Sequence, residues 1–313
     1  MFLVATLISS SAPPALDNGA IERVQSALSS RQAPDWLDPG VAADVFFTEQ
    51  DSVQDCAQDS AQHSDLRALA DRARAALAGA PIDVVVQGAI GRRKQLLLAD
   101  MDSTMIGQEC IDELAEHVGK KRQVAAITER AMRGEIEFEP ALRERVALLK
   151  GLAAAAIDEV IDTRIRLNPG ARTLVATMRR NGGYTCLVSG GFTLFTHRIA
   201  GMIGFDEHRA NRLLVDADGR LAGEVAEPIL GRAGKLATLI ELTQRRNLTP
   251  DATLVAGDGA NDIPMIEAAG LGVAYHAKPK VAASAAARID HGDLLGLLYA
   301  QGYRRDEFVS DDG

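Results

Sequence analysis

Four short apolar runs, separated by longer amphipathic stretches, limit the fold of residues 95–275 more than any other feature of the sequence. They read QLLLAD, YTCLVS, ATLVAG and LGVAY. Strands that are apolar along their whole length are buried on both faces, and the helices between them supply that cover. The pattern therefore predicts an α/β fold built on a parallel sheet.

The first part of the chain follows a different plan, in which strands and helices alternate over short distances. Its predicted strands are residues 2–9, 43–48 and 82–88, and its predicted helices are residues 21–30 and 64–77. Since 313 residues suffice for about two domains, we expect a small α+β domain over residues 1–88 and a second domain over residues 89–313. The polar, aperiodic residues 48–65 are predicted to form a surface loop.

A long insert separates the first two apolar runs. Residues 107–168 contain several amphipathic stretches, such as QECIDELAEHVG and ALRERVALLKG, and Pro169 and Gly170 end them. An almost wholly helical segment directly after a strand end is placed to cover whatever binds there. We expect it to form a cap.

Composition excludes several classes of partner. A net charge of -9 and a pI near 5.2 disfavour nucleic acid and anionic membranes, which are bound by clustered cations. The start, MFLVATLISSSAPPA, lacks the positive region of a signal peptide and is too short to span a bilayer. Three irregularly spaced cysteines favour neither a disulfide framework nor a thiolate zinc site. We expect a cytoplasmic protein that acts on a small molecule.

The residues that follow the apolar runs are candidates for a site, because ligands of open α/β sheets bind outside the carboxyl ends of the strands. In chain order they are Asp100, Asp102, Ser103, Thr104, Ser189, Gly190, Gly191, Gly257, Asp258, Gly259, Asn261 and Asp262. Lys235 stands at a predicted helix start, in GRAGKLATL. Taken singly, the acids and hydroxyl residues can be helix caps, the glycines turn residues and Lys235 a solvated lysine.

Taken together, DMDST, VSGGF, Lys235 and GDGANDIPM resemble the four ordered motifs of the haloacid dehalogenase superfamily of phosphatases. The resemblance implies a Rossmann-like core with a helical cap and the hydrolysis of a phosphate monoester in two steps. Asp100 would attack phosphorus to form an aspartyl-phosphate, which water then cleaves. Asp102 would give a proton to the leaving alkoxide and take one from the attacking water.

The resemblance also implies a magnesium ion. A carboxylate that attacks a dianionic phosphate is repelled by it, and a hard divalent cation offsets that repulsion. By resemblance, its ligands would be the Asp100 side chain, the Asp102 backbone carbonyl and Asp258. Asp262 would have a supporting role.

The phosphoryl oxygens have candidate partners of their own in the same motifs. Ser189, Lys235 and the backbone N–H groups near Gly190 would stabilise charge on these oxygens. Asn261 is expected beside them as a further substrate-binding residue.

Within the insert, DSTMIGQECIDELA and MRGEIEFEPALRERVALLKGL resemble phosphoserine phosphatases, which implies hydrolysis of O-phospho-L-serine to L-serine and phosphate, the last step of serine biosynthesis. By this resemblance Glu109 would bind the substrate ammonium, Arg145 its carboxylate, and Phe138 would close over it. A zwitterion needs one buried anion and one planar cation that binds a carboxylate bidentately. The plainer alternatives are a helix N-terminal acid, a solvated arginine and a core aromatic.

Three functions stay open at the level of sequence. Besides a phosphoserine phosphatase, the chain can be a related phosphotransferase or phosphatase for another small phosphomonoester, or a catalytically silent amino-acid-binding regulator. The intact set of catalytic candidates disfavours the third. The order of elements in residues 1–88 is similar to that of ACT-like regulatory domains, so we expect this unit to support a homodimer or to bind an amino acid such as serine.

Overall fold

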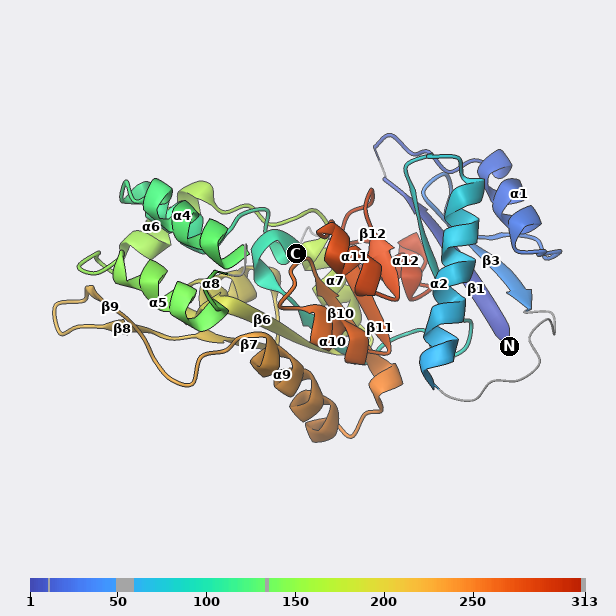
Figure 1. The fold of residues 1–313 in the computed structure, drawn as a ribbon. Helices are drawn as coiled ribbons and strands as arrows, with labels where there is room; N and C mark the ends of the chain where they lie inside the picture. The colour runs from blue at the N-terminus through green and yellow to red at the C-terminus, as the bar shows by residue number, and fades with distance from the viewer. Residues whose placement is uncertain (11, 49–58, 133–134, 311–313) are drawn as a thin grey trace.

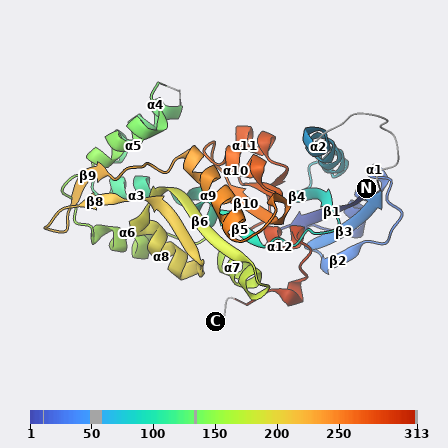
Figure 2. The same ribbon diagram turned by 90° about the horizontal axis from the view of Figure 1, so that it is seen from below.

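The computed structural model describes residues 1–10, 12–48, 59–132 and 135–310. Its parts are a small N-terminal sheet, a central six-stranded sheet and a helical insert (Figure 1). A second view shows the N-terminal sheet and the insert at opposite ends of the molecule, with the central sheet between them (Figure 2). Among the described residues, no helix has both the length and the apolar composition needed to cross a bilayer.

The central sheet is parallel throughout, with the strand order β12-β11-β10-β5-β6-β7. Its strands are β5 (Leu96–Ala99), β6 (Tyr184–Phe192), β7 (Glu207–Asn211), β10 (Thr253–Gly257), β11 (Leu271–Tyr275) and β12 (Ala287–Ile289). The four apolar runs form β5, β6, β10 and β11, which confirms the predicted α/β core. The edge strand β7 was not predicted, because its sequence EHRAN is polar.

Helices cover both faces of this sheet. They are α7 (Ala171–Arg180), α8 (Thr193–Ile203), α9 (Arg232–Arg245), α10 (Ile263–Ala268), α11 (Pro279–Ser284) and α12 (Gly296–Ala300). Alternate residues of β5 enter different cores: Leu97 and Ala99 pack with residues of α7 and α8, and Leu96 and Leu98 pack with residues of α9 and α10. Burial on both faces explains the unbroken apolar run.

Strands β10, β5 and β6 are neighbours at the centre of the sheet, and their register decides where the site lies. Thr253 of β10 stands opposite Leu96 of β5, which in turn stands opposite Tyr184 of β6. Because the three strands are parallel, their carboxyl ends meet at one edge. The segments that follow them therefore come together, although they are far apart in the sequence.

The N-terminal unit is an antiparallel sheet of order β2-β3-β1-β4 with two helices. Its elements are β1 (Phe2–Ser9), α1 (Asn18–Ala27), β2 (Asp35–Asp38), β3 (Ala42–Thr48), α2 (Asp59–Ala76) and β4 (Ile82–Gly88). The short polar strand β2 was missed. Helix α1 begins earlier than predicted, because Asp17 caps it by accepting a hydrogen bond from Ala20 N at 2.7 Å.

One loop prediction in this unit was partly wrong. Residues 59–65 form the first turns of α2 rather than a loop, since helix formation continues upstream from the amphipathic part of that helix. Residues 49–58, the rest of the predicted loop, lie outside the described residues.

The N-terminal sheet and the central unit share a hydrophobic core and a polar contact. Ile8 and Val85 pack in the same buried cluster as residues of α12. The carboxylate of Asp83, 3% exposed, accepts hydrogen bonds from three successive backbone N–H groups, those of residues 290–292, at 2.8 to 3.2 Å. The proposed boundary at residues 88 and 89 stays a prediction.

The insert lies between β5 and α7 and is helical, as predicted. Its helices are α3 (Cys110–His117), α4 (Lys121–Met132), α5 (Phe138–Ala147) and α6 (Ala156–Arg164). An unpredicted hairpin, β8 (Leu213–Val215) with β9 (Leu221–Val225), packs on it. Gly151 N donates to Leu221 O at 2.8 Å, and Leu221 N donates to Leu152 O at 2.8 Å. The insert is therefore braced by a segment more than fifty residues downstream.

Candidate active site

A cavity of about 170 Å³ opens where β5, β6 and β10 end, beneath the insert. Core and insert both contribute to its walls. The lining residues are Asp100, Asp102, Glu109, Ile111, Phe138, Leu142, Arg145, Ser189, Gly190, Gly191, Phe192, Asp258, Gly259, Asn261 and Lys278. Every residue expected to act in catalysis, to bind substrate or to bind the metal directly is among them except Lys235, which lies behind the wall, as does the supporting Asp262.

Lys235 joins two carboxylates behind the cavity. It stands in the first turn of α9 and is 0% exposed. Its Nζ lies 2.8 Å from Asp100 Oδ1 and 2.6 Å from Asp262 Oδ1. Burial alone lowers the pKa of Lys235, but the attraction of Asp100 and Asp262 outweighs it and leaves that pKa raised. Lys235 is therefore a fixed positive charge.

Asp100, directly after β5, is held by one of its two oxygens. Met101 N donates to Oδ1 at 2.7 Å, and the Lys235 ammonium contacts the same Oδ1. Among the described residues, nothing donates a hydrogen bond to Oδ2. Burial, and then the charge of Asp262, raises the pKa of Asp100 well above its ordinary value, against the opposing effect of Lys235. The carboxylate thus has one anchored oxygen and one oxygen that is available to react.

Asp102 faces the cavity from a kinked turn after β5, in which its own backbone is extended, with φ -66° and ψ 136°. Within this turn, Met101–Met105, Ser103 has a φ of 56°, in the left-handed region. Asp102 accepts hydrogen bonds from Cys110 N at 2.8 Å and from Ser189 Oγ at 3.2 Å. Burial raises the pKa of Asp102, and the hydrogen bond from Cys110 opposes this rise. A carboxyl group that keeps its proton more readily than usual is suited to proton transfer.

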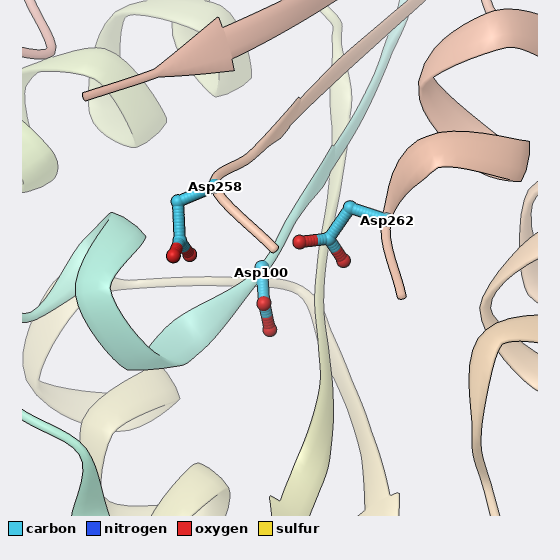
Figure 3. A group of neighbouring side chains, drawn as sticks. All are labelled: Asp100, Asp258 and Asp262. Carbon is cyan, nitrogen blue, oxygen red and sulfur yellow. The ribbon is translucent and has the colours of Figure 1, made fainter. Parts of the chain in front are cut away.

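Asp258 and Asp262 bring two further carboxylates to Asp100 from the segment after β10 (Figure 3). Oxygens of the three side chains lie within 4.8 Å of one another. Thr104 Oγ1 donates to Asp258 Oδ1 at 3.1 Å. Asp262 has both oxygens engaged, one with the lysine ammonium and the other with Gly259 N at 3.0 Å. A Cβ at position 257 would lie 2.6 Å from the Asp262 carboxyl. Only glycine at this position leaves room for the Asp262 side chain.

This crowding of carboxylates fits a metal ion. Burial, and then the charge of Asp262, raises the pKa of Asp258 to about 6. Carboxylates buried this close together repel one another unless a proton or a cation lies between them. A ligand set made only of oxygen atoms suits a hard divalent cation. Among the described residues, Asp100 and Asp258 each keep an oxygen without a hydrogen bond, so these two can hold the ion while Asp262 holds Lys235.

The β6 segment contributes a loop whose backbone approaches the cavity closely. Its pairing with β7 shifts register between Val188 and Phe192, so Ser189, Gly190 and Gly191 leave the regular ladder. Ser189, 1% exposed, accepts a hydrogen bond from Gly191 N at 2.8 Å through its Oγ. The two glycines have no side chain to fill the cavity. The loop can therefore lie directly against a bound anion.

The insert supplies Glu109, Phe138 and Arg145. Ser103 Oγ donates to Glu109 Oε1 at 2.8 Å, and Arg145 Nη1 donates to Thr128 Oγ1 at 3.5 Å. The Glu109 side chain reaches water through the cavity mouth, yet desolvation by the surrounding protein, followed by the charge of Asp102, raises its pKa to about 7. One acid and one guanidinium thus face the cavity on the insert side.

Several residues that line or support the site were not predicted from sequence, for different reasons. Ile111 and Leu142 are ordinary helix-face hydrophobes, which a sequence pattern assigns to the core. Lys278 follows β11 and could have been found by the same strand-end rule. Asn211, which holds the β6 loop from behind, ends a strand that was itself not predicted.

Comparisons with known proteins agree with this geometry. The family model of haloacid dehalogenase-like hydrolases matches residues 97–267, which include β6, β10 and all but the first residue of β5. A phosphoserine phosphatase of Polaromonas sp. (strain JS666) is 48% identical over 209 residues, which are 65% of this chain and 88% of that relative. A haloacid dehalogenase family hydrolase from Salmonella enterica serovar Typhi superposes with a TM-score of 0.80 at 27% identity, covering 96% of this chain and 98% of its own. A probable phosphoserine phosphatase from Vibrio cholerae gives 0.76 at 28% identity, covering 98% and 88%.

Proposed function

The chain belongs to the haloacid dehalogenase-like hydrolases, and from this premise we propose that it is a magnesium-dependent phosphoserine phosphatase. It would hydrolyse O-phospho-L-serine to L-serine and inorganic phosphate. The observation that carries the proposal is one cavity that is lined both by Asp100 and by Glu109 and Arg145. The phosphoserine phosphatases among its relatives support the choice of substrate.

The first step would be an attack by Asp100. Its Oδ2 forms a bond to phosphorus while Oδ1 stays held by Met101 N and Lys235. The bond between phosphorus and the serine oxygen breaks, and Asp102 gives its proton to that oxygen. Burial raises the pKa of Asp102, which favours its protonated form. Serine leaves, and an aspartyl-phosphate remains.

The second step would reverse the role of Asp102. As a carboxylate it takes a proton from a water molecule, which attacks phosphorus and displaces the Asp100 carboxylate. The Ser189 hydroxyl, which donates to Asp102 Oδ2 at 3.2 Å, would hold that carboxylate in place. Lys235 is charged in both steps and offsets the negative charge on the phosphoryl oxygens and on Asp100. Inorganic phosphate is released, and Asp100 is restored.

Phosphatases of this family are generally metal-dependent, and we propose magnesium here. The carboxylates of Asp100 and Asp258 would hold the ion, with the Asp102 backbone carbonyl as a further ligand and Asp262 in support. Bound there, magnesium supplies positive charge that offsets the repulsion between a carboxylate and a dianionic phosphate. The raised pKa values of Asp100 and Asp258 support this, since both carboxylates gain from a cation.

Recognition of serine would come from the insert. Glu109 would bind the ammonium, Arg145 the carboxylate, and Phe138 would cover the substrate. Gly190 and Asn261 would contact the phosphoryl side. Arg145 donates from Nε to Ala141 O at 3.2 Å and from Nη1 to Thr128 Oγ1 at 3.5 Å, so among the described residues its Nη2 has no partner and is available to a substrate carboxylate.

The test is phosphate release from phosphoserine, phosphothreonine, phosphoethanolamine and a sugar phosphate, with magnesium and with chelator. We expect magnesium-dependent preference for phosphoserine. Asp100→Asn should abolish turnover, whereas the surface variant Asp218→Asn should keep it. Activity without preference would discard the assignment of Glu109 and Arg145, and transfer to an added alcohol in place of release would make the enzyme a phosphotransferase.

We also propose that the enzyme acts in the cytoplasm. Cys110 and Cys186 are free and buried, as expected of a protein kept in a reducing compartment. A homodimer through the N-terminal unit stays a prediction. Sedimentation of the purified chain would decide between monomer and dimer.

A further inference from the structure

Asn211 is a buried amide whose hydrogen bonds all go to backbone groups of two loops at the site. It ends β7, is 2% exposed and does not line the cavity. Its Nδ2 donates to Gly190 O at 2.9 Å and to Leu230 O at 3.1 Å, and its Oδ1 accepts from Leu230 N at 2.6 Å. Both of its N–H groups and its oxygen are thus used.

The first of these loops needs an outside partner. Between β6 and β7, Val188 stands opposite Arg209 and Phe192 stands opposite Asn211, so three residues of β6 face a single residue of β7. Within this bulge Gly190 cannot use the regular ladder for its carbonyl oxygen. A buried carbonyl without a partner is unfavourable. Asn211 supplies that partner from its side chain.

The second loop leads into the helix that carries Lys235. Leu230 precedes Gly231, whose carbonyl oxygen accepts a hydrogen bond from Lys235 N at 3.0 Å. By holding both the N–H and the carbonyl of Leu230, Asn211 fixes the backbone on which the first turn of α9 is built. The β6 loop and the turn that precedes Lys235 are therefore both hydrogen-bonded to the Asn211 carboxamide.

The two loops also meet under an aromatic ring of the insert. A Cβ placed on Gly190 would lie 3.4 Å from the Phe138 ring, and a Cβ on Gly231 would lie 3.3 Å from it. The Phe138 ring therefore packs against both glycines. A shift of one loop relative to the other would change the position of this ring as well as the distance from the β6 loop to Lys235.

We propose that Asn211 is a positioning residue for phosphoryl transfer. It holds the β6 loop at a fixed position relative to Lys235 and to the Phe138 ring. The inference rests on the proposed function, because the reacting phosphoryl group would lie between these elements. Misplacement of a reacting group by about 1 Å can reduce a rate by about a hundredfold.

The test uses Asn211→Asp, which keeps the shape of the side chain but loses both N–H donors. The matched control is Asn181→Asp, because Asn181 also donates to a backbone carbonyl, Thr177 O at 2.9 Å, but lies in the turn before β6, at the opposite end of that strand from the site. Turnover is measured well below the unfolding temperature with phosphoserine and with p-nitrophenyl phosphate. We expect kcat to fall about 10- to 100-fold for both substrates in Asn211→Asp, with KM for phosphoserine changed less than about threefold, and no such fall in the control.

Amide hydrogen exchange gives a readout that does not depend on activity. In Asn211→Asp the amides of residues 189–191 and 230–231 should exchange faster than in the wild type, and in Asn181→Asp they should not. Asn211→Ala serves the same comparisons if the aspartate variant fails to fold. A folded variant with kcat within threefold of wild type, a loss of kcat that cooling restores, or unchanged exchange would each overturn the inference. If the wild type releases no phosphate from any ester, the proposed function fails and the exchange comparison alone decides the role of Asn211.

Discussion

Replacing Lys235 by methionine should destabilise the protein in a pH-dependent way. The change removes the only charge that separates Asp100 from Asp262 behind the cavity, among the residues described, and keeps the length of the side chain. At an effective dielectric constant of about 20, each contact, at 2.8 and 2.6 Å, is worth about 6 kcal/mol as an upper limit. Desolvation of the ammonium offsets much of this, so we expect a net loss of about 3–5 kcal/mol at pH 8.

The sign of the pH dependence follows from Asp100. Its pKa is already raised in the folded protein, and loss of Lys235 removes a group that lowers it. A carboxyl group whose pKa is higher in the folded protein than in the unfolded chain binds more protons when folded. The free energy of unfolding therefore falls as pH rises through the range between these two pKa values, and it increases again as pH is lowered. The difference between wild type and Lys235→Met should therefore narrow from pH 8 to pH 5.

Urea unfolding in the presence of chelator, at pH 5, 6.5 and 8, measures this difference. Lys94→Met is the matched control, since Lys94 is 8% exposed and its ammonium donates to a carbonyl oxygen, Asp251 O at 2.8 Å. Its loss should be smaller, about 1–2 kcal/mol, and nearly independent of pH over this range. Equal losses of unfolding free energy for the two variants, both independent of pH, would refute the assignment of Lys235 as the cation that stabilises the buried carboxylates of Asp100 and Asp262.

Three further outcomes are expected from the contacts described above. Arg145→Ala should raise KM for phosphoserine about 10- to 100-fold but leave phosphoethanolamine, which has no carboxylate, within about threefold, whereas Arg143→Ala on the exposed face of the same helix should change neither in steady-state assays. Asp83→Ala should lower the free energy of unfolding by about 2–4 kcal/mol, because the backbone N–H groups that this carboxylate accepts from lose their partner, and urea titration would show it. Glu207→Gln should cost about 1–2 kcal/mol at pH 7 in thermal unfolding: burial raises the pKa of Glu207, but hydrogen bonds, chiefly from Arg245, bring it down to about 2, so the stabilisation is present above pH 4.5 and lost as pH falls toward 2.

Local sequence was sufficient for the parts of the fold that are buried on both faces. The run at residues 96–99 is apolar because each face of β5 meets a different core, and the same physics places Asp100 and Asp258 at one edge of the sheet. Polar edge elements carry no such signal. Strand β7 and the β8-β9 hairpin gain their stability from neighbours distant in sequence, so neither they nor Asn211 could be predicted from local pattern.

The core and the insert hold their site residues in different ways. On the core side, Lys235 and Asp262 are fully buried and bonded to one another, which fixes the charges around phosphorus before any substrate arrives. On the insert side, Arg145 has one weak side-chain partner and Glu109 is held through a single hydroxyl, so both depend on the substrate to complete their contacts. Changes in the insert can therefore alter which alcohol carries the phosphate without disturbing the chemistry at Asp100. The same division explains why the motifs of the core identify a reaction, whereas only the insert identifies a substrate.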